Sequence, residues 1–419
     1  MDSVMPQTSS EIAEWVSAAA LRLEDKVIAW RRDIHQHPEL SYQETRTAAL
    51  AADHLRALGY EVTTGVGETG VIGMLKGDKP GPVVALRADM DALPVEERVD
   101  VPFASKVKAL WQGQMTGVMH ACGHDAHVAI LMGVAEILAA YRAELTGTVK
   151  LLFQPNEEGT EGRPSGAQAM IDDGALANPA PSAVFGLHVA SALASGVIAL
   201  RPGGLMASAD RLRIDVQGRQ THASMPWYGV DPIVTSAQII LALQTMVTRQ
   251  IDSTITPAVL SIATIHGGVR SNILPDGVRM EGTLRAHDEG VRTDIKRRIA
   301  KTAAAIADAA GATATVEIGE GVPVTYNDPA LTQWGTRSLG HGVGADRVTE
   351  SRPVMGAEDF SLLANVVPGL FFFLGVTPPD EDPREAPANH SPLFHIHEPA
   401  LKYGVRSLAY LAIDYLRRG

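Results

Sequence analysis

The only cysteine of this 419-residue chain, Cys122, lies among three histidines. The stretch "MHACGHDAHVA" covers residues 119–129 and contains His120, His124 and His127. A single cysteine cannot form an internal disulfide, which indicates a reducing compartment and leaves the thiol as a nucleophile, a metal ligand or a small core side chain. Isolated cysteines are commonly buried in the core, but four potential ligands within eight residues favour a metal site.

Other groups that can bind a metal or move a proton follow apolar runs elsewhere in the chain. Glu157 and Glu158 follow "LLFQPN", His188 follows "AVFGL", and His390 lies in "ANHSP" after the "FFF" run. Each has an ordinary alternative explanation: a solvated acidic pair, a core histidine and a turn residue. Adjacent carboxylates can instead divide two tasks, one binding metal and the other facing the substrate.

As a set, these side chains offer N, S and O donors suited to one or two divalent transition metals, with Zn, Mn, Co and Ni all compatible. The candidate ligands are Cys122, His124, Glu158, His188 and His390.

Composition narrows the possible partners. The formal charge of −12 without a basic stripe argues against nucleic-acid binding. The sequence contains no uninterrupted run of 18 apolar residues, so it predicts no membrane-spanning helix. The first 27 residues predict an acidic amphipathic helix rather than a secretory signal, so we expect a cytoplasmic protein. A small molecule is the expected substrate, and an anionic one would need local cations to hold it.

The elements that must position these side chains alternate between buried strands and helices. Strand-like runs cover residues 81–87, 147–153, 183–187 and 369–375, and a helix that is apolar nearly all round follows the cysteine cluster. This alternation predicts an α/β domain with a mixed, largely parallel sheet in three layers. Ligands of such sheets bind beyond the carboxyl ends of the strands, so we expect the polar clusters to converge there.

Between residues 207 and 321 the pattern changes to β-α-β-β-α-β, with the period-two alternation "DRLRIDVQ" in its first strand. This order predicts an inserted α+β ferredoxin-like domain with an antiparallel sheet. The catalytic domain would then comprise residues 1–206 and 322–419. An exposed sheet edge in the insertion could form a dimer interface, so we expect a homodimer or higher homo-oligomer.

Several motifs occur in the order that is typical of a known family. They are "RRDIHQHPELSYQE", "ADMDALP", "GVMHACGHDAHVA", "FQPNEEG", "SNILPD", "GTLRA", "GAEDFS" and "NHSPLF". Together they resemble the metal-dependent aminoacylase/carboxypeptidase family, in its branch of hippurate hydrolases and indole-acetyl-amino-acid hydrolases. The resemblance extends from about Trp30 to the C-terminus.

The resemblance implies a dinuclear site in which Cys122 is a bridging thiolate. His124, Glu158, His188 and His390 would be terminal ligands, and Glu157 would be the general base that holds a metal-bound water.

The resemblance also implies roles around this set. Asp89 and Asp91 occupy the place of a ligating His-x-Asp in distant relatives. Here we expect them to contact the metal ligands rather than the metal itself. His222 would reach the partner's site in a dimer and polarise the scissile carbonyl. Asn272 and Arg285 match positions that hold a substrate carboxylate.

These roles predict an amidohydrolase that cleaves N-acyl amino acids. One alternative is hydrolytic deamination of a carboxylated aromatic amine at the same site, as in relatives resembling nitroanthranilate aminohydrolase. Another is a metal-stabilised binding protein without turnover, which the retained Glu157 disfavours. A zinc endopeptidase is disfavoured because the chain has no H-E-x-x-H helix.

The chain departs from the family pattern near the substrate pocket. It reads "GRQTHASMPW" around His222, inserts "TEGRPS" after Gly159 and has His397 where an aspartate is common. We expect His395 and His397 to be structural.

Overall fold

The computed structural model describes residues 5–252 and 256–418, which form two compact units. The first unit comprises residues 1–203, 326–352 and 362–419, and the second comprises residues 204–325 and 353–361. The helices are α1 (Ser9–Gln36), α2 (Thr45–Ala57), α3 (His124–Ala140), α4 (Gly166–Asp172), α5 (Pro232–Gln250), α6 (Glu289–Ala309), α7 (Pro329–Val343), α8 (Phe360–Val366) and α9 (Leu401–Leu416).

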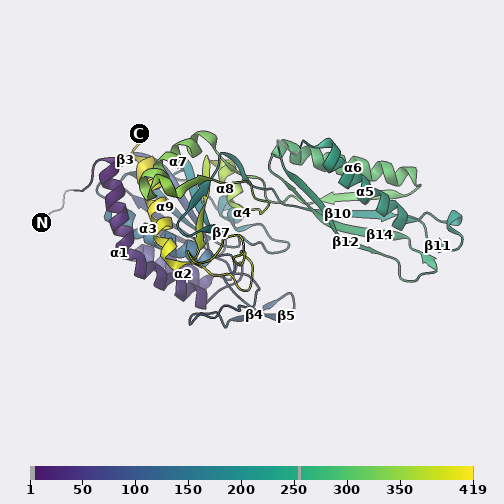
Figure 1. Cartoon of the computed structure of the whole chain (residues 1–419), viewed down its shortest axis with the longest axis horizontal. Helices are drawn as coiled ribbons and strands as arrows, with labels where there is room; N and C mark the ends of the chain where they lie inside the picture. Colours follow the sequence, from purple (N-terminus) through teal and green to yellow (C-terminus); the bar gives the residue numbers. More distant parts are fainter. Residues whose placement is uncertain (1–4, 253–255, 419) are drawn as a thin grey trace. The chain divides into compact units, whose positions relative to one another are not determined.

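An eight-stranded sheet organises the first unit (Figure 1). In spatial order its strands are β1 (Glu61–Val66), β2 (Gly70–Lys76), β6 (Thr146–Gln154), β3 (Lys79–Asp89), β7 (Ala183–Ala194), β18 (Gly369–Thr377), β8 (Ile198–Leu200) and β17 (Val348–Glu350). The four central strands β6, β3, β7 and β18 are parallel to one another. β1 and β2 pair antiparallel with their neighbours, whereas β8 is antiparallel to β18 and parallel to β17. The predicted mixed, largely parallel sheet is therefore confirmed.

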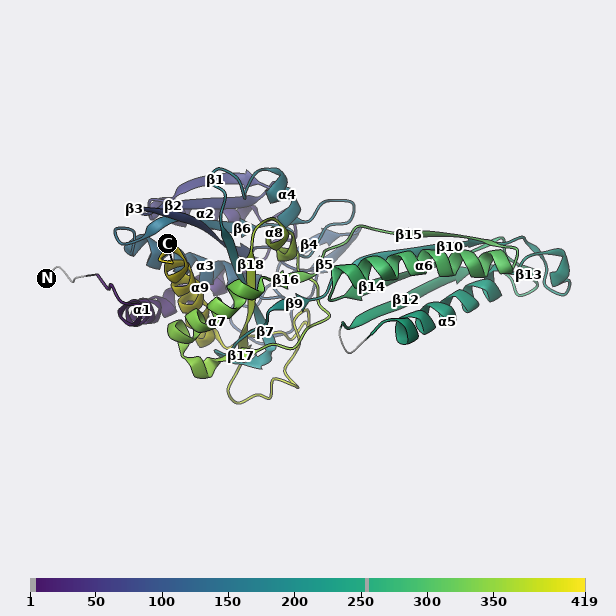
Figure 2. The same ribbon diagram turned by 90° about the horizontal axis from the view of Figure 1, so that it is seen from above.

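Helices cover both faces of this sheet. α3 and α9 pack on one face with α1 outside them, and the core between them includes Val149 and Leu151 of β6 (Figure 2). Successive side chains of a strand point to opposite faces. Lys150 thus points to the other face, where its ammonium donates to the carbonyl of Ala175, just beyond α4. The sheet accordingly forms the middle of three layers.

The prediction that the strand at residues 183–187 ends at His188 is wrong, because β7 continues to Ala194. On one side β3 pairs with β7 only as far as Gly186, whereas on the other β18 pairs with it to Ala194. His188 therefore lies beyond the part of β7 that pairs with β3, although its own strand continues.

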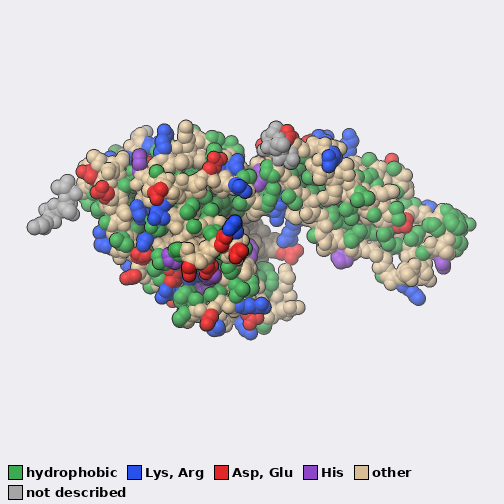
Figure 3. All heavy atoms as spheres, in the orientation of Figure 1, with side chains coloured by type: hydrophobic (Ala, Val, Ile, Leu, Met, Phe, Trp, Pro, Cys, Tyr) green, Lys and Arg blue, Asp and Glu red, His purple; other side chains and the backbone are tan. Residues whose placement is uncertain are grey.

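The second unit has the predicted β-α-β-β-α-β order. Its sheet consists, in spatial order, of β12 (Ala258–Gly267), β14 (Gly277–Ala286), β10 (Asp210–Gln217) and β15 (Thr313–Ile318). All three pairings are antiparallel, and the apolar sides of α5 and α6 pack against the sheet. This arrangement confirms the ferredoxin-like insertion. Hydrophobic side chains also gather on the visible surface of the part that carries α5 and α6 (Figure 3).

A later segment, residues 353–361, also belongs to the second unit, which the sequence pattern did not predict. The backbone N–H of Ala207 donates to the carbonyls of Val354 and Gly356, and the hydroxyl of Thr325 donates to the carbonyl of Glu358. The remaining strands are short: β4 (Lys108–Trp111), β5 (Gln114–Gly117), β9 (Gly203–Met206), β11 (Thr221–His222), β13 (Ile273–Leu274) and β16 (Thr325–Asn327). No helix in the described ranges is both long and apolar enough to cross a bilayer.

Candidate metal centre

The turn at the start of α3 places Cys122 and His124. Gly123 precedes the helix with φ of 89°, and a Cβ atom there would lie 2.3 Å from a methyl carbon of Val189. Only glycine adopts this conformation here without strain or collision, so the turn can direct both neighbouring side chains into one space. Cys122 Sγ lies 3.4 Å from Nε2 of His188 on β7.

His390 reaches the same thiol from the loop after β18. Its backbone N–H donates to the carbonyl of Ala121 at 2.7 Å, and the side-chain amide of Asn389 donates to the carbonyl of Cys122 at 3.1 Å. With the loop anchored in this way, His390 Nε2 lies 3.1 Å from Cys122 Sγ and 3.2 Å from Oε1 of Glu158.

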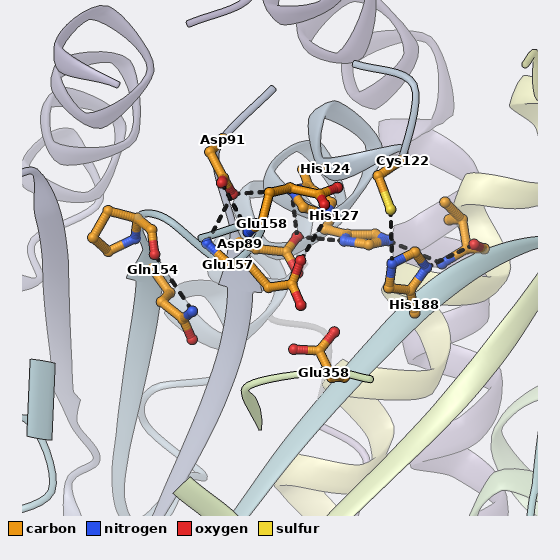
Figure 4. Close-up of polar contacts among 12 residues, drawn as sticks. Asp89, Asp91, Cys122, His124, His127, Gln154, Glu157, Glu158, His188 and Glu358 are labelled. Atoms are coloured by element: carbon orange, nitrogen blue, oxygen red, sulfur yellow. Dashed lines mark hydrogen bonds and ion pairs between the residues drawn. The ribbon is translucent and has the colours of Figure 1, made fainter. Parts of the chain in front are cut away.

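The five predicted ligands thus gather in one place. Ligand atoms of Cys122, His124 and His188 lie within 4.8 Å of one another, and so do those of Cys122, Glu158 and His390. Cys122 belongs to both groups. Glu157 and Glu158 also form a group with His124 under the same distance limit, and Figure 4 shows their carboxylates beside the histidine rings.

The ring nitrogens of two histidines are arranged as a metal ligand requires. Nδ1 of His188 donates to the carbonyl of Val189 at 2.8 Å, which leaves the lone pair on Nε2, the atom beside Cys122. Nδ1 of His124 lies 3.2 Å from Asp91, whereas its Nε2 is buried and makes no hydrogen bond to any described residue. A divalent cation fits this set, because it would satisfy the buried nitrogen and bind the surrounding S and O donors.

The electrostatics of the cluster also suit a cation. Burial, together with the charges of Glu158 and Glu157, raises the pKa of the Cys122 thiol well above its usual value. Burial by itself would lower the pKa of His124, but the carboxylates of Asp89 and Asp91 outweigh it and raise that pKa to about 10. Without a cation both groups are protonated near neutral pH, and a bound cation would displace these protons.

Asp91 holds the backbone of the acidic turn, residues 156–158, by hydrogen bonds. Its two carboxylate oxygens accept the backbone N–H groups of Glu157 and Glu158, each at 3.1 Å, and Oδ2 also accepts the hydroxyl of Ser41 at 2.7 Å. Asp91 thus contacts a candidate ligand and the candidate base at once.

Asp89 has two partners that sequence analysis did not assign. Arg87 donates to it at 2.6 Å, and Nδ1 of His127 lies 2.5 Å from its other oxygen. Nε2 of His127 accepts the backbone N–H of Val189 at 2.9 Å, so the ring proton is on Nδ1 and points to Asp89. The spacing of His127 three residues after His124 on one helix face was the available signal.

The remaining predicted residues lie in the second unit. His222 is on β11 opposite Ile273 of β13, and the carbonyl of Asn272 accepts the backbone N–H of Ala223 at 3.0 Å. Arg285 lies near the end of β14, eight residues beyond Gly277. At about 3.3 Å per residue, Gly277 and Arg285 are roughly 26 Å apart along β14. His222 pairs with β13, which ends three residues before Gly277, so we infer that Arg285 and His222 lie toward opposite ends of one unit.

The departures from the family pattern have local partners. In the inserted loop, the guanidinium of Arg163 lies 3.9 Å from the ring centre of Tyr42, whose hydroxyl donates to the carbonyl of Pro164. His397 Nδ1 lies 2.7 Å from the hydroxyl of Ser195, and His395 Nε2 lies 2.9 Å from Glu381. None of these side chains is part of the groups around Cys122.

Comparison with known proteins places this site in context. The family model described as peptidase family M20/M25/M40 matches residues 85–414. Thermostable carboxypeptidase 2 of Saccharolobus solfataricus is 44% identical over 407 residues, which cover 97% of this chain and 99% of that protein. N-acetyl-L-cysteine deacetylase of Bacillus subtilis is 38% identical over 90% of this chain and 85% of that protein. IAA-amino acid hydrolase ILR1-like 2 of Arabidopsis thaliana is also 38% identical, over 94% of this chain and 86% of that protein.

Solved structures agree with these relatives. A proposed aminohydrolase from methicillin-resistant Staphylococcus aureus matches with a TM-score of 0.88 and 33% identity, over 96% of this chain and 99% of that one. A Bacillus subtilis protein described as a dinuclear metal-binding peptidase matches with a TM-score of 0.79 and 34% identity, over 94% of this chain and 99% of that one. The protein is thus a metal-dependent hydrolase of amide or peptide bonds. Its sequence, its fold and the donor set around Cys122 agree that the chain belongs to peptidase family M20/M25/M40.

Proposed function

We propose that the protein hydrolyses the amide bond of N-acyl amino acids, of the hippurate-like, N-acetyl or aryl-acyl kind, to a carboxylic acid and an amino acid. The observation that carries this proposal is a second carboxylate beside the ligand set. Glu158 lies with Cys122 and His390, while Oε2 of the adjacent Glu157 lies 3.8 Å from Nε2 of His124. A purely structural metal site has no use for an additional carboxylate at this position.

In this mechanism Glu157 is the general base. A divalent cation held by Cys122, His124, Glu158, His188 and His390 would supply Lewis acidity and lower the pKa of a water molecule at the site. Glu157 would take the proton of that water and deliver it to the leaving amine. Cys122 acts as a ligand rather than a nucleophile, because its burial and the nearby carboxylates oppose a free thiolate.

The names of the relatives support an amino acid as the leaving group. They describe a carboxypeptidase, an N-acetylcysteine deacetylase and an IAA-amino acid hydrolase. Such substrates share an amide whose nitrogen belongs to an amino acid with a free carboxylate. We assign Asn272 and Arg285 to that carboxylate, since a chain of charge −12 needs local donors and cations to hold an anion.

We also propose that the protein is a homodimer joined through its second unit. β12 is an edge strand of that sheet, with Val259 and Ile265 39% and 49% exposed, and Leu241 of α5 is 69% exposed. An apolar edge of this kind is a liability unless a partner covers it. Because Arg285 and His222 lie at opposite ends of one unit, a site that uses both would take them from two copies.

A substrate panel tests the proposed function. The protein loaded with Mn, Zn or Co would be incubated with hippurate, N-acetyl and indole-acyl amino acids, short peptides and aminobenzoates, and free amino acid and ammonia would be quantified by mass spectrometry. Glu157→Ala and Glu157→Gln should keep the metal and lose turnover by about 100-fold or more. Ammonia release from an aminobenzoate, with the acyl amino acids untouched, would replace amide hydrolysis with deamination at this site.

A further inference from the structure

Three consecutive backbone N–H groups in the acidic turn are each accepted by a buried carboxylate. Those of Glu157 and Glu158 donate to Asp91, as described above, and that of Asn156 donates to Oε1 of Glu44 at 2.9 Å. Glu44 stands 47 residues before Asp91 in the chain and belongs to the segment "ELSYQE" at residues 39–44. This acid is not among the candidate ligands, bases or substrate contacts.

Glu44 is fully buried, and its described hydrogen bonds come from backbone and hydroxyl donors. Oε1 also accepts the backbone N–H of Tyr42 at 2.9 Å, and Oε2 accepts the hydroxyl of Thr69 at 2.6 Å. Among the described residues, no Lys, Arg or His lies within ion-pair distance of it. Burial, followed by the charge of Asp91, raises the pKa of Glu44 to about 7. A buried acid without a cation is unfavourable for stability, so its hydrogen bonds point to a positional role.

The turn that Glu44 contacts has a backbone that needs support. Asn156 has φ of 47°, in the left-handed region that residues other than glycine seldom adopt. Its carbonyl accepts the N–H of Gly166 at 3.0 Å, and its side chain donates to the carbonyl of Pro164 at 3.0 Å. Such a conformation persists only when its surroundings over-determine it, and the bond to Glu44 is one of these constraints.

We propose that Glu44 is a positioning residue for the metal centre. By accepting the N–H of Asn156, it fixes the backbone from which the side chains of Glu157 and Glu158 extend. Ser41, three residues earlier, donates to Asp91, so one short segment supports both carboxylates that hold this turn. The part of this inference that concerns Glu157 as base rests on the proposed function, whereas the part that concerns Glu158 and metal affinity does not.

Two substitutions at Glu44 test the proposal in the full-length protein. Glu44→Ala removes the acceptor and should weaken the affinity for Zn or Mn by about 10–100-fold. This is the usual effect of losing a group whose hydrogen bonds orient the metal ligands. Turnover of any accepted substrate should fall by a similar factor through kcat, with KM changed less than about threefold. Glu44→Gln keeps an acceptor oxygen for both N–H groups and should restore metal affinity to within about threefold of the native protein.

A matched control separates positioning from general destabilisation. Asp328 of the same unit accepts the N–H of Leu331 at 2.7 Å at the start of α7, so Asp328→Ala removes a comparable bond elsewhere. It should lower the melting temperature without changing the affinity for metal measured by calorimetry. Native metal affinity in Glu44→Ala, or an equal loss in Asp328→Ala, would overturn the proposal.

The calorimetric readout also separates this inference from the proposed function. If the native protein released no amino acid from any acyl substrate, the proposed function would fail, but the metal affinities of the Glu44 variants would still decide the role of Glu44. If native turnover were observed and Glu44→Ala bound metal normally, only the positioning role would fail.

Discussion

Nδ1 of His124 lies 3.2 Å from Oδ1 of Asp91, and this contact orients the opposite nitrogen of the ring toward the acidic turn. A histidine that donates one ring N–H to a carboxylate presents the other nitrogen as a ligand of fixed direction and increased basicity. Asp91 accepts the N–H groups of Glu157 and Glu158 as well. One carboxylate therefore aligns a candidate ligand from α3 with the two acids that follow β6.

Metal binding should release protons from Cys122 and His124. The pKa of each group is raised in the absence of a cation, that of His124 to about 10, so both are protonated near neutral pH. As the pH falls, protons compete more strongly with the metal, so affinity should fall by up to about tenfold per pH unit for each proton displaced. Calorimetric titration with Zn in buffers of different ionisation enthalpy measures this release, and a buffer-independent heat would contradict it.

The substitution Cys122→Ala should remove at least one metal ion per chain, because Cys122 belongs to both groups of candidate ligands. Inductively coupled plasma mass spectrometry of the dialysed protein gives the stoichiometry. His397→Ala is the control, since that ring contacts Ser195 and should leave the metal content unchanged. Equal metal content in the Cys122→Ala and native proteins would rule out a bridging thiolate.

If His222 acts across a dimer, two inactive variants should complement each other. Random pairing of Glu157→Ala with His222→Ala subunits makes half of the dimers mixed, and each mixed dimer has one intact site out of two. Activity should therefore recover to about a quarter of the native value on mixing and refolding or on co-expression. Absence of recovery, with mixed dimers verified by mass spectrometry, would place His222 within its own subunit or outside the reaction.

The stability of the second unit should depend on buried ion pairs of Asp210. Asp210 of β10 is buried and lies 2.7 Å from both Arg292 and Lys296 of α6. Removing the charge in Asp210→Asn leaves Arg292 without its main partner, and we expect a loss of about 3 kcal/mol in the free energy of unfolding. Denaturant titration followed by circular dichroism measures this loss, with the exposed Asp53→Asn as control.

The same pair predicts the direction of acid sensitivity. Burial by itself would raise the pKa of Asp210, but the bonds from Arg292 and Lys296 outweigh it and lower that pKa. The carboxylate thus stabilises the fold above its unfolded pKa, and this contribution is lost as the pH falls through the lower, folded value. Thermal unfolding at decreasing pH should show a smaller acid-induced decrease for Asp210→Asn than for the native protein. Parallel pH profiles would exclude this contribution.

Much of the site could be predicted from the sequence because its side chains follow apolar runs. A buried strand is recognisable by its composition, and in a parallel sheet the ends of such strands share one edge. This reasoning predicted that Glu158, His188 and His390 converge on Cys122, and the structure brings the four together, although the strand that carries His188 continues to Ala194. The ferredoxin-like order of the insertion was predictable for a similar reason, since period-two and helical patterns are local properties.

Tertiary structure alone decided which groups support that site. Glu44 and Arg87 resemble ordinary polar residues in the sequence, and His127 resembles a further candidate ligand. Their supporting roles depend on contacts with Asn156, Gln154 and Val189 from other segments. The return of residues 353–361 to the second unit likewise rests on backbone pairing that side-chain patterns do not encode. By itself, the sequence determined the types of the ligands and the strands that carry them, because these follow from local composition. The buried hydrogen bonds that orient the ligands link distant parts of the chain, so only the folded structure decided them.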